Sequence, residues 1–316
     1  MAHKKTLRIF FATLLFCLLA GSSQAGQKIT VLLDWFANPD HGPMYVALEK
    51  GFFAAHGLEP EFIAPANPND PPKLVAAGKA DLAVSYQPQH YMQVEQGLPL
   101  VRIATLVATP LNSLVVLEAS PITSIGDLKG KTIGYSVSGF ETALLETMLA
   151  SAGLTPEDVT TVNVNFSLSP ALLSGKVDAV IGAFRNFELN QMAMEGHPGR
   201  AFYVEEHGVP AYDELIIVAN ANKIHDPKYK QFVLALEEGV QYTINHPEES
   251  WKLFIKGRPD LDSELNHRAW KDTLPRFALR PGALDYNRYK KVGTFLQKRG
   301  MISHEIPVEK LAVEIK

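Results

Sequence analysis

A four-residue unit, Gly-Lys-x-Asp, occurs twice in this chain, and an apolar stretch follows each copy. The copies begin at Gly78 and Gly175, 97 residues apart. Glycine favours the left-handed conformation that ends a helix, lysine suits a helix C-terminus, and aspartate suits the turn into a strand. One copy alone is a weak signal, but the flanking strand–loop–helix–Gly–strand pattern also repeats. The repeat therefore predicts two similar α/β lobes.

The chain is expected to cross between these lobes twice. The pattern predicts that it leaves the first lobe near residues 109–114 and returns near residues 212–218, after a loop-like stretch over 203–214. Two crossings form a hinge, so the lobes should face each other across a cleft. We therefore assign residues 26–110 and 215–316 to lobe one and residues 111–214 to lobe two. Beyond residue 226 the pattern is mostly helical, with helices predicted over 229–245, 247–255 and 284–299.

The first 25 residues have the pattern of a cleavable secretory signal peptide. A basic start is followed by an apolar run over 9–20, too short to span a bilayer, and then by the small-x-small site Ser23-Gln24-Ala25. The only cysteine, Cys17, lies inside this segment, and Phe16 stands where a lipoprotein signal needs a small residue. We therefore expect an exported, periplasmic protein that is not lipidated and has no disulfide or cysteine–metal site.

Composition excludes some classes of partner. The 316 residues are 46% hydrophobic and 20% charged, with a formal net charge of −4 and a pI near 6.2. This is ordinary globular composition, long enough for two domains. Because there is no basic excess, binding of nucleic acid is not expected.

Polar and aromatic side chains follow the predicted strands, and the first such loop is the richest. The run 29–33 leads into Asp34-Trp35-Phe36-Ala37-Asn38-Pro39-Asp40-His41, and a helix is expected over 42–55. In an open α/β sheet, ligands lie beyond the carboxyl ends of strands. The loop after the second Gly-Lys-x-Asp unit, residues 182–188, should face it across the cleft. Apart from Arg185 these loops hold no cation, which disfavours a phosphate ligand.

The residues predicted to contact a ligand come from both lobes and from the two crossings. They offer aromatic faces to stack on a ring, and amides, hydroxyls and carboxylates to bond its edge. The predicted ligand-binding residues are Asp34, Trp35, Asn38, His41, Tyr86, Gln89, Asn112, Ser136, Phe184, Asn186, Glu188 and Tyr212. Asp40 is interpreted as support for the helix that follows it. No catalytic, cofactor-binding or metal-binding residue is assigned.

Enzyme interpretations have weaker support in the sequence. Gly134-Tyr135-Ser136-Val137-Ser138 lies between a strand and a helix, as a nucleophile elbow does, but Ser138 replaces the final glycine. No histidine is tied to it by order or spacing, and the ten histidines show no metal-binding spacing. Trp251 and Trp270 lie in the mostly helical C-terminal region and are assigned to core packing.

The stretch from Asp34 to His41, followed by Tyr45-Val46-Ala47-Leu48-Glu49-Lys50-Gly51-Phe52-Phe53, carries a family resemblance. Together with residues 73–89, 110–113, 128–135 and 170–188, it resembles the NMT1/THI5-like substrate-binding proteins of ABC transporters, and most of all the ThiY type. The resemblance implies the type II periplasmic-binding-protein fold, with two lobes that close over a ligand. It further implies a thiamin-precursor pyrimidine as ligand, N-formylated or hydroxymethylated, and a membrane permease with its ATPase as partners of a monomer.

On this interpretation Trp35 and either Tyr86 or Phe184 stack on the pyrimidine ring. Glu188 and Asp34 accept from its amino or protonated ring nitrogen, while Asn38, Asn112 and Asn186 bond its edge. One departure concerns the run Phe184 to Glu188, because ThiY-like chains commonly carry tryptophan where Arg185 and Phe187 stand here. Relatives that bind riboflavin-like or sulfonate compounds therefore stay open as alternatives.

The same superfamily contains a pyrimidine synthase that uses pyridoxal phosphate and iron. The resemblance places its cofactor-binding lysine at Ser85 and a histidine at Gln89, and it places a cysteine-rich run near residues 214–217. Serine cannot form a Schiff base. The sequence therefore favours a binding protein over this enzyme.

Overall fold

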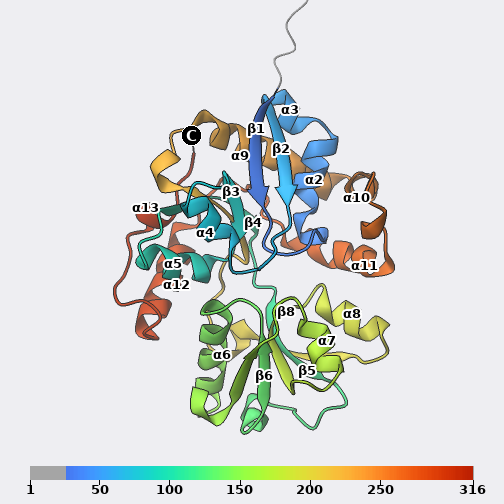
Figure 1. Ribbon diagram of the computed structural model, residues 1–316, viewed down its shortest axis with the longest axis vertical. Helices are drawn as coiled ribbons and strands as arrows, with labels where there is room; N and C mark the ends of the chain where they lie inside the picture. Colours follow the sequence, from blue (N-terminus) through green and yellow to red (C-terminus); the bar gives the residue numbers. More distant parts are fainter. Residues whose placement is uncertain (1–25, 316) are drawn as a thin grey trace, which may run out of the picture.

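Two five-stranded sheets, each covered by helices, form two lobes that lie one above the other (Figure 1) in the computed structural model. The structure describes residues 26–315; the predicted signal peptide lies outside the described residues. The two-lobe α/β architecture predicted from the repeat is therefore confirmed. Within residues 26–315, no helix combines the length and apolarity that crossing a membrane requires.

The first sheet has the strand order β2-β1-β3-β10-β4. Strand β1 pairs in parallel with β2 and β3, whereas β10 is antiparallel to both β3 and β4. The chain thus returns from the second lobe to fill a central position in the first. The strands are β1 (Gln27–Leu32), β2 (Leu58–Ile63), β3 (Leu82–Ser85), β4 (Leu100–Val107) and β10 (Leu215–Asn220).

The second sheet repeats this arrangement with the order β7-β6-β8-β5-β9. Strand β6 is parallel to β7 and β8, and β5 is antiparallel to β8 and β9. In each sheet the antiparallel strand next to the edge strand, β10 beside β4 or β5 beside β9, is the one that enters from the other lobe. The strands are β5 (Asn112–Leu117), β6 (Thr132–Tyr135), β7 (Thr160–Asn163), β8 (Ala179–Phe184) and β9 (Gly199–Tyr203).

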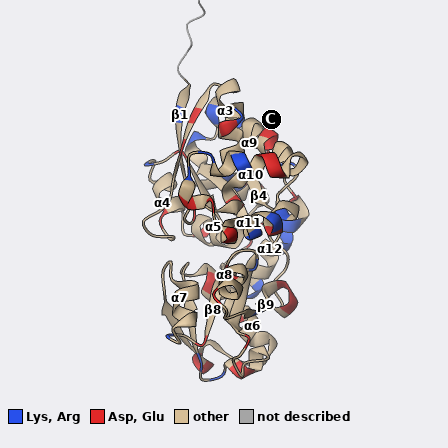
Figure 2. Ribbon diagram, turned by 90° about the vertical axis from the view of Figure 1, so that its right-hand side faces the viewer, with Lys and Arg blue, Asp and Glu red and all other residues tan. Residues whose placement is uncertain are grey.

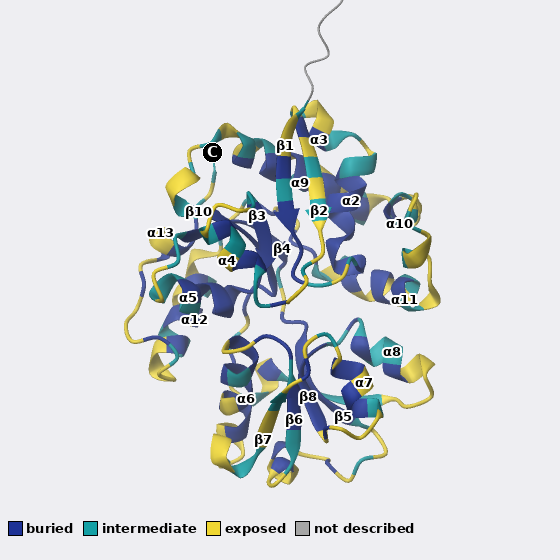
Figure 3. Ribbon diagram, in the orientation of Figure 1, coloured by how far each residue is buried: buried dark blue, intermediate teal, exposed yellow. Residues whose placement is uncertain are grey.

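Helices cover both faces of each sheet, so the central strands are buried (Figure 3). In the first lobe they are α2 (Gly42–Glu49), α3 (Phe52–Ala55), α4 (Pro71–Ala76), α5 (Gln87–Glu95), α9 (Pro227–Asn245), α10 (Pro247–Ile255), α11 (Glu264–Thr273), α12 (Tyr286–Lys298) and α13 (Val308–Leu311). In the second they are α6 (Phe140–Ser151), α7 (Leu168–Leu173) and α8 (Glu188–Met194). Single 3₁₀ turns are η1 (Pro39–His41), η2 (Ile125–Leu128), η3 (Pro156–Asp158), η4 (Val204–His207), η5 (Ala221–Lys223), η6 (Pro259–Leu261) and η7 (Leu274–Arg276).

The repeated Gly-Lys-x-Asp unit has the same structure in both lobes. Gly78 and Gly175 have φ of 71° and 70°, the left-handed conformation that ends α4 and α7. The carboxylate of Asp81 accepts a hydrogen bond of 2.9 Å from the amide of Thr30 in β1, and Asp178 accepts one of 2.8 Å from Thr132 in β6. The aspartate therefore joins the start of the central strand, β3 or β8, to the strand beside it, β1 or β6.

Several predicted elements differ from the structure. The single helix expected over 42–55 is two helices, because Gly51 adopts a left-handed φ of 75° between them. Strand β8 continues to Phe184, where a loop was expected from residue 182. Strand β9 and helix α11 were not predicted: β9 is a half-buried edge strand, and α11 is polar apart from its buried face.

The two crossings lie side by side and are bonded to each other. They join β4 to β5 and η4 to β10. Glu214, in the second crossing, accepts hydrogen bonds from the backbone amides of Leu111 and Asn112 in the first, the latter at 2.8 Å. The hydroxyl of Tyr212 donates to the same carboxylate at 3.0 Å. The exact lobe boundaries at residues 110/111 and 214/215 stay a prediction.

Candidate ligand-binding site

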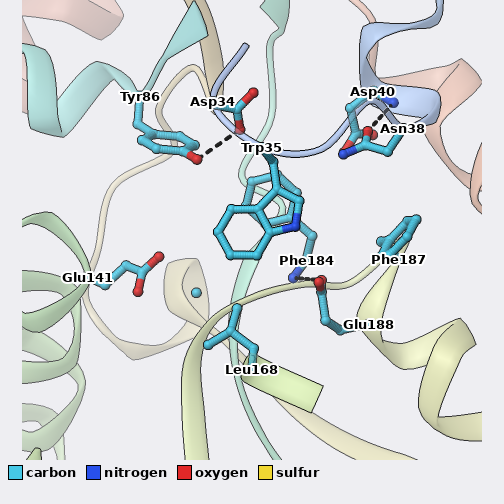
Figure 4. Close-up of a pocket in the computed structure, with 11 residues that line it drawn as sticks. Asp34, Trp35, Asn38, Asp40, Tyr86, Glu141, Leu168, Phe184, Phe187 and Glu188 are labelled. Atoms are coloured by element: carbon cyan, nitrogen blue, oxygen red, sulfur yellow. Dashed lines mark hydrogen bonds between the residues drawn. The ribbon is translucent and has the colours of Figure 1, made fainter. Parts of the chain in front are cut away.

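A cavity of about 390 Å³ lies between the lobes, where the loops that follow β1, β3 and β8 meet. Its walls come from both lobes (Figure 4). The lining residues are Asp34, Trp35, Asn38, Asp40 and Tyr86 from the first lobe, and Glu141, Leu168, Gly182, Phe184, Phe187 and Glu188 from the second.

Asp34 is held in place by its neighbours in the first lobe. One carboxylate oxygen lies 2.8 Å from Nε2 of His41, and the other accepts from the hydroxyl of Tyr86 at 2.8 Å. The amide of Asn38 donates to Nδ1 of His41 at 3.3 Å. Since Nδ1 must then be an acceptor, the proton of the neutral ring is on Nε2 and points at Asp34. His41 is fully buried and thus orients Asp34 from behind the cavity wall.

Three further carboxyl groups reach the cavity, and each is anchored through one oxygen. Glu141 accepts from the amide of Ser136 at 2.6 Å, and Glu188 accepts from the amide of Phe184 at 2.6 Å. Oδ1 of Asp40 accepts from the side chain of Asn186 at 2.6 Å and from the hydroxyl of Thr273 at 2.9 Å. Oδ2 of Asp40 is buried and has no partner in the described chain. One oxygen of each group is thus left for a ligand.

Burial makes these carboxyl groups hard to ionise. It raises the pKa of Glu141 to about 8 and that of Glu188 to about 8, against the backbone hydrogen bonds that favour the charged form. Burial also raises the pKa of Asp40 to about 6, although His41 and the hydrogen bonds from Thr273 and Asn186 act in the other direction. Among the described residues no lysine, arginine or histidine lines the cavity. Figure 2 shows basic residues gathered around α12 instead.

Glu141 depends on a glycine opposite it. Gly182, in the middle of β8, has a φ of 103°, and a Cβ at this position would collide with both carboxyl oxygens of Glu141. Only glycine adopts such a φ without strain. The carboxyl group of Glu141 therefore occupies the space that a side chain at 182 would fill.

Aromatic rings form the flat walls of the cavity. Trp35 reaches from the first lobe to Phe166 in the second, with ring centroids 4.5 Å apart and planes at 65°. Tyr86 stacks on Phe140 of the second lobe at 5.1 Å, with planes 13° apart. Phe184 meets Tyr86 edge-on at 6.5 Å. Since all three contacts cross the cleft, the aromatic side chains help to hold it closed.

Polar contacts close the cleft on two sides. The side chain of Asn186 in the second lobe donates to Asp40 and, at 2.6 Å, to Thr273 of α11. Elsewhere on the rim, Asn69 of the first lobe accepts from the amide of Ser138 at 2.8 Å. The structure is thus a closed form, and a ligand in the cavity would be shielded from solvent.

The structure brings half of the predicted site residues to the cavity wall. The six that line it are Asp34, Trp35, Asn38, Tyr86, Phe184 and Glu188. The other six, His41, Gln89, Asn112, Ser136, Asn186 and Tyr212, bond to other parts of the protein.

Those other bonds explain the placements. Gln89 accepts from Ser85, and the side chain of Asn112 accepts from the amide of Gly182 at 3.1 Å. The hydroxyl of Ser136 donates to the carbonyl of Asn165, so no histidine activates it as a nucleophile. Arg185 forms an ion pair with Glu205 and lies over Tyr203, away from the cavity. The positive charge expected near the ligand is therefore absent from the described cavity wall.

Five lining residues were not among the predicted ligand contacts. Asp40 was assigned to helix support, and Phe187 was noted only as a departure from the family pattern. Nothing in the sequence indicated a ligand contact at Leu168, Gly182 or Glu141. The position of Glu141, at the start of a helix after a strand-end loop, was the one feature that could have indicated it.

Comparison with known proteins establishes the family. The sequence model of the family described as NMT1/THI5 like matches residues 38–250. The chain belongs to the NMT1/THI5-like family.

Individual relatives of this NMT1/THI5-like protein differ in what their names describe. A Haemophilus influenzae protein named for thiamine biosynthesis is 54% identical over 313 residues, covering 99% of this chain and 100% of that protein. The formylaminopyrimidine-binding protein of Halalkalibacterium halodurans is 33% identical over 257 residues, 81% of this chain and 78% of its own. A 4-amino-5-hydroxymethyl-2-methylpyrimidine phosphate synthase of Uromyces fabae is 32% identical over 252 residues, 76% and 74% of the two chains.

Solved structures support the fold. The alkanesulfonate-binding protein SsuA of Xanthomonas axonopodis pv. citri superimposes with a TM-score of 0.71, covering 92% of this chain and 98% of that one, at 14% sequence identity. The periplasmic-binding-protein fold implied by the sequence is thereby confirmed.

Replacing Gly182 by alanine should displace Glu141. We expect Gly182→Ala to lower the free energy of unfolding by more than Gly175→Ala, because both add a Cβ at positive φ but only the first meets other atoms. The strain common to both is about 1–2 kcal/mol, and the collision adds about 1–3 kcal/mol. Urea unfolding of the two variants measures the difference. Equal losses of stability would show that Glu141 does not need the space over residue 182.

The stability of the ligand-free protein should depend on Glu141 and pH. Burial raises the pKa of this group in the folded state from 4.5 to about 8, so the folded state keeps a proton that the unfolded state has released. The group therefore contributes stability that is lost as pH rises from about 4.5 to 8. Urea unfolding at about pH 5.5 and at about pH 8 measures this loss. Between these two pH values the free energy of unfolding should fall less for Glu141→Gln than for the exposed control Glu146→Gln. The same fall in both variants would contradict the burial of a protonated Glu141.

Proposed function

We propose that this protein is the solute-binding component of an ABC importer and that its ligand is a 4-aminopyrimidine of the thiamin-precursor type. The observation that carries the proposal is the closed cavity between the lobes, walled by aromatic rings and four carboxyl groups with no lysine or arginine among its described lining residues. Membership of the family and the relative named as a formylaminopyrimidine-binding protein support it.

The chemistry of an aminopyrimidine suits these walls. Its flat ring can stack on Trp35, the tryptophan of the cavity, and each stacked pair contributes about 0.5–1.5 kcal/mol beyond area burial. Its edge presents a ring nitrogen beside an amino group. The free oxygen of a carboxyl group can form a hydrogen bond with that edge, whichever partner carries the shared proton. A carboxyl group with a raised pKa, such as Glu188, is suited to share that proton.

The remaining parts of the proposal follow from this role. The closed protein would dock on a membrane permease driven by an ATPase, and opening of the hinge would release the ligand. Export through the predicted signal peptide to the periplasm, as a monomer without a lipid anchor, fits the same role. Two features have no part in the proposed function, because neither lines the cavity: the break at Gly51 and the exposed face of α11.

An enzymatic function is less well supported, although relatives include pyrimidine phosphate synthases. At the position where the resemblance places their cofactor-binding lysine, Ser85 is buried and hydrogen-bonded to Gln89. Neither the hydroxyl of Ser85 nor any described residue of the cavity wall supplies an amine for a Schiff base. We therefore propose a binding protein that is not an enzyme.

Other solute classes fit the cavity less well. A sulfonate would bring a negative charge among four carboxyl groups with no lining cation to pair with it. A riboflavin-like ligand has a three-ring system and a ribityl chain, so it needs a larger space between the closed lobes than a single-ring pyrimidine does. The acidic walls instead favour a small ligand rich in N–H donors.

Calorimetry with 4-amino-5-hydroxymethyl-2-methylpyrimidine and its N-formylaminomethyl analogue tests the proposal. We expect both to bind the wild-type protein. Glu188→Gln should weaken binding about 10- to 100-fold, since a hydrogen bond to a charged group contributes about 1.5–3 kcal/mol. Glu195→Gln, at the other end of α8, is the matched control. If no pyrimidine gives either binding heat or a thermal shift, the ligand class is refuted. Unchanged affinity in Glu188→Gln would remove this residue from the site.

A further inference from the structure

The free carboxyl oxygens of the cavity are not gathered at one point. In Figure 4, Glu141 lies on one side, below Tyr86, while Asp40 and Glu188 lie on the opposite side, and the indole of Trp35 stands between them. Each of the three groups uses one oxygen to accept from the protein. A ligand that contacts both sides therefore needs hydrogen-bond donors at both of its ends.

The side with Glu141 offers more than one acceptor. Tyr86 gives its hydroxyl proton to Asp34, so its oxygen can only accept from a further partner. Figure 4 shows the carboxyl group of Glu141 below the ring of Tyr86, whose hydroxyl is bonded to Asp34. All three are at least nine-tenths buried. Among the described residues, this side of the cavity is thus a cluster of acceptors, and the proton it can give is the one that the buried carboxyl group of Glu141 keeps.

We propose that the ligand carries a primary amine on its side arm, as in 4-amino-5-aminomethyl-2-methylpyrimidine, and that Glu141 is the residue that selects it. The inference rests on the proposed function, because it takes the aminopyrimidine ring as given. It extends that function by naming the charge of the ligand's second end. The edge of the ring pairs with Glu188 and Asp40, and the ammonium group of the arm lies against Glu141.

The donors of the possible side arms decide between them. A hydroxymethyl arm has one O–H donor and no charge, and an N-formylaminomethyl arm has one N–H donor and no charge. An aminomethyl arm is an ammonium group at neutral pH, with three donors and a positive charge. A buried carboxylate is costly unless a charge pairs with it. No described cation lines the cavity, so Glu141 keeps its proton at neutral pH in the ligand-free protein. It can ionise beside a ligand that brings a positive charge, which the ammonium arm supplies and the two neutral arms do not.

The position of Glu141 is built rather than incidental. The amide of Ser136 fixes one oxygen, and Gly182 leaves the space in which the carboxyl group lies. Both residues belong to the second lobe, so the carboxyl group is in place before the cleft closes. The acceptors of Asp34 and Tyr86 come from the first lobe. An ammonium group bridging the two sets would favour the closed form.

The test is calorimetry of the wild type, Glu141→Gln and the control Glu146→Gln with the aminomethyl, hydroxymethyl and N-formylaminomethyl pyrimidines. Glu146 is exposed on the same helix as Glu141. We expect the wild type and the control to bind the aminomethyl compound at least tenfold more tightly than the other two. In Glu141→Gln that ratio of dissociation constants should fall at least tenfold.

Two results would overturn the inference. One is a wild-type protein that binds the hydroxymethyl or the N-formyl compound as tightly as the amine. The other is a Glu141→Gln variant that keeps the wild-type ratio or weakens all three ligands equally, as a purely supporting residue would. If the variant does not fold, the ratio of dissociation constants in the wild-type protein still tests whether the amine is preferred. If none of the three compounds binds the wild type, the proposed function itself fails, which is a different outcome.

Discussion

Four carboxyl groups share one buried cavity, and the protein places no cation beside them among its described lining residues. Burying a carboxylate without a charge partner is costly, so the groups bind protons more tightly, and the pKa of Glu141 and of Glu188 rises to about 8. Backbone amides hold one oxygen of Glu141 and of Glu188, and the side chains of Asn186 and Thr273 hold one oxygen of Asp40. Asp34 is held at both of its oxygens, by His41 and Tyr86. The remaining oxygens form a template for a small molecule with many N–H donors.

The duplicated lobe explains how such a cavity can be assembled. In each lobe an aspartate of the Gly-Lys-x-Asp unit joins the central strand to the parallel strand beside it, so the two sheets present equivalent strand ends. Glu214 bonds the two crossings together and sets the edge along which the lobes meet. Asn186 then joins Asp40 and Thr273 across the closed cleft. Asp40 therefore belongs to both the cavity wall and the closure contact, which couples the two.

Features that depend on the repeat and on strand-end loops could be predicted from the sequence. The duplication indicated both lobes, the cleft and six lining residues, among them Trp35 and Glu188. It could not show side-chain direction: Asn112 and Asn186 lie near strand ends as a ligand contact would, yet both bond to protein. The position of Thr273 could not be predicted, because the sequence of its helix has little apolar pattern. Glu141 was missed because its role depends on Gly182, which is distant in sequence and adjacent only in the fold.

A crystal structure of the protein with a bound 4-aminopyrimidine tests most directly whether the acidic cavity between the lobes is the binding site. The expected result is a ring in this cavity, beside Trp35, with its amino edge within hydrogen-bond distance of the free oxygen of Glu188 or Asp40. A ring bound elsewhere, or an empty cavity at concentrations where calorimetry detects binding, would contradict it.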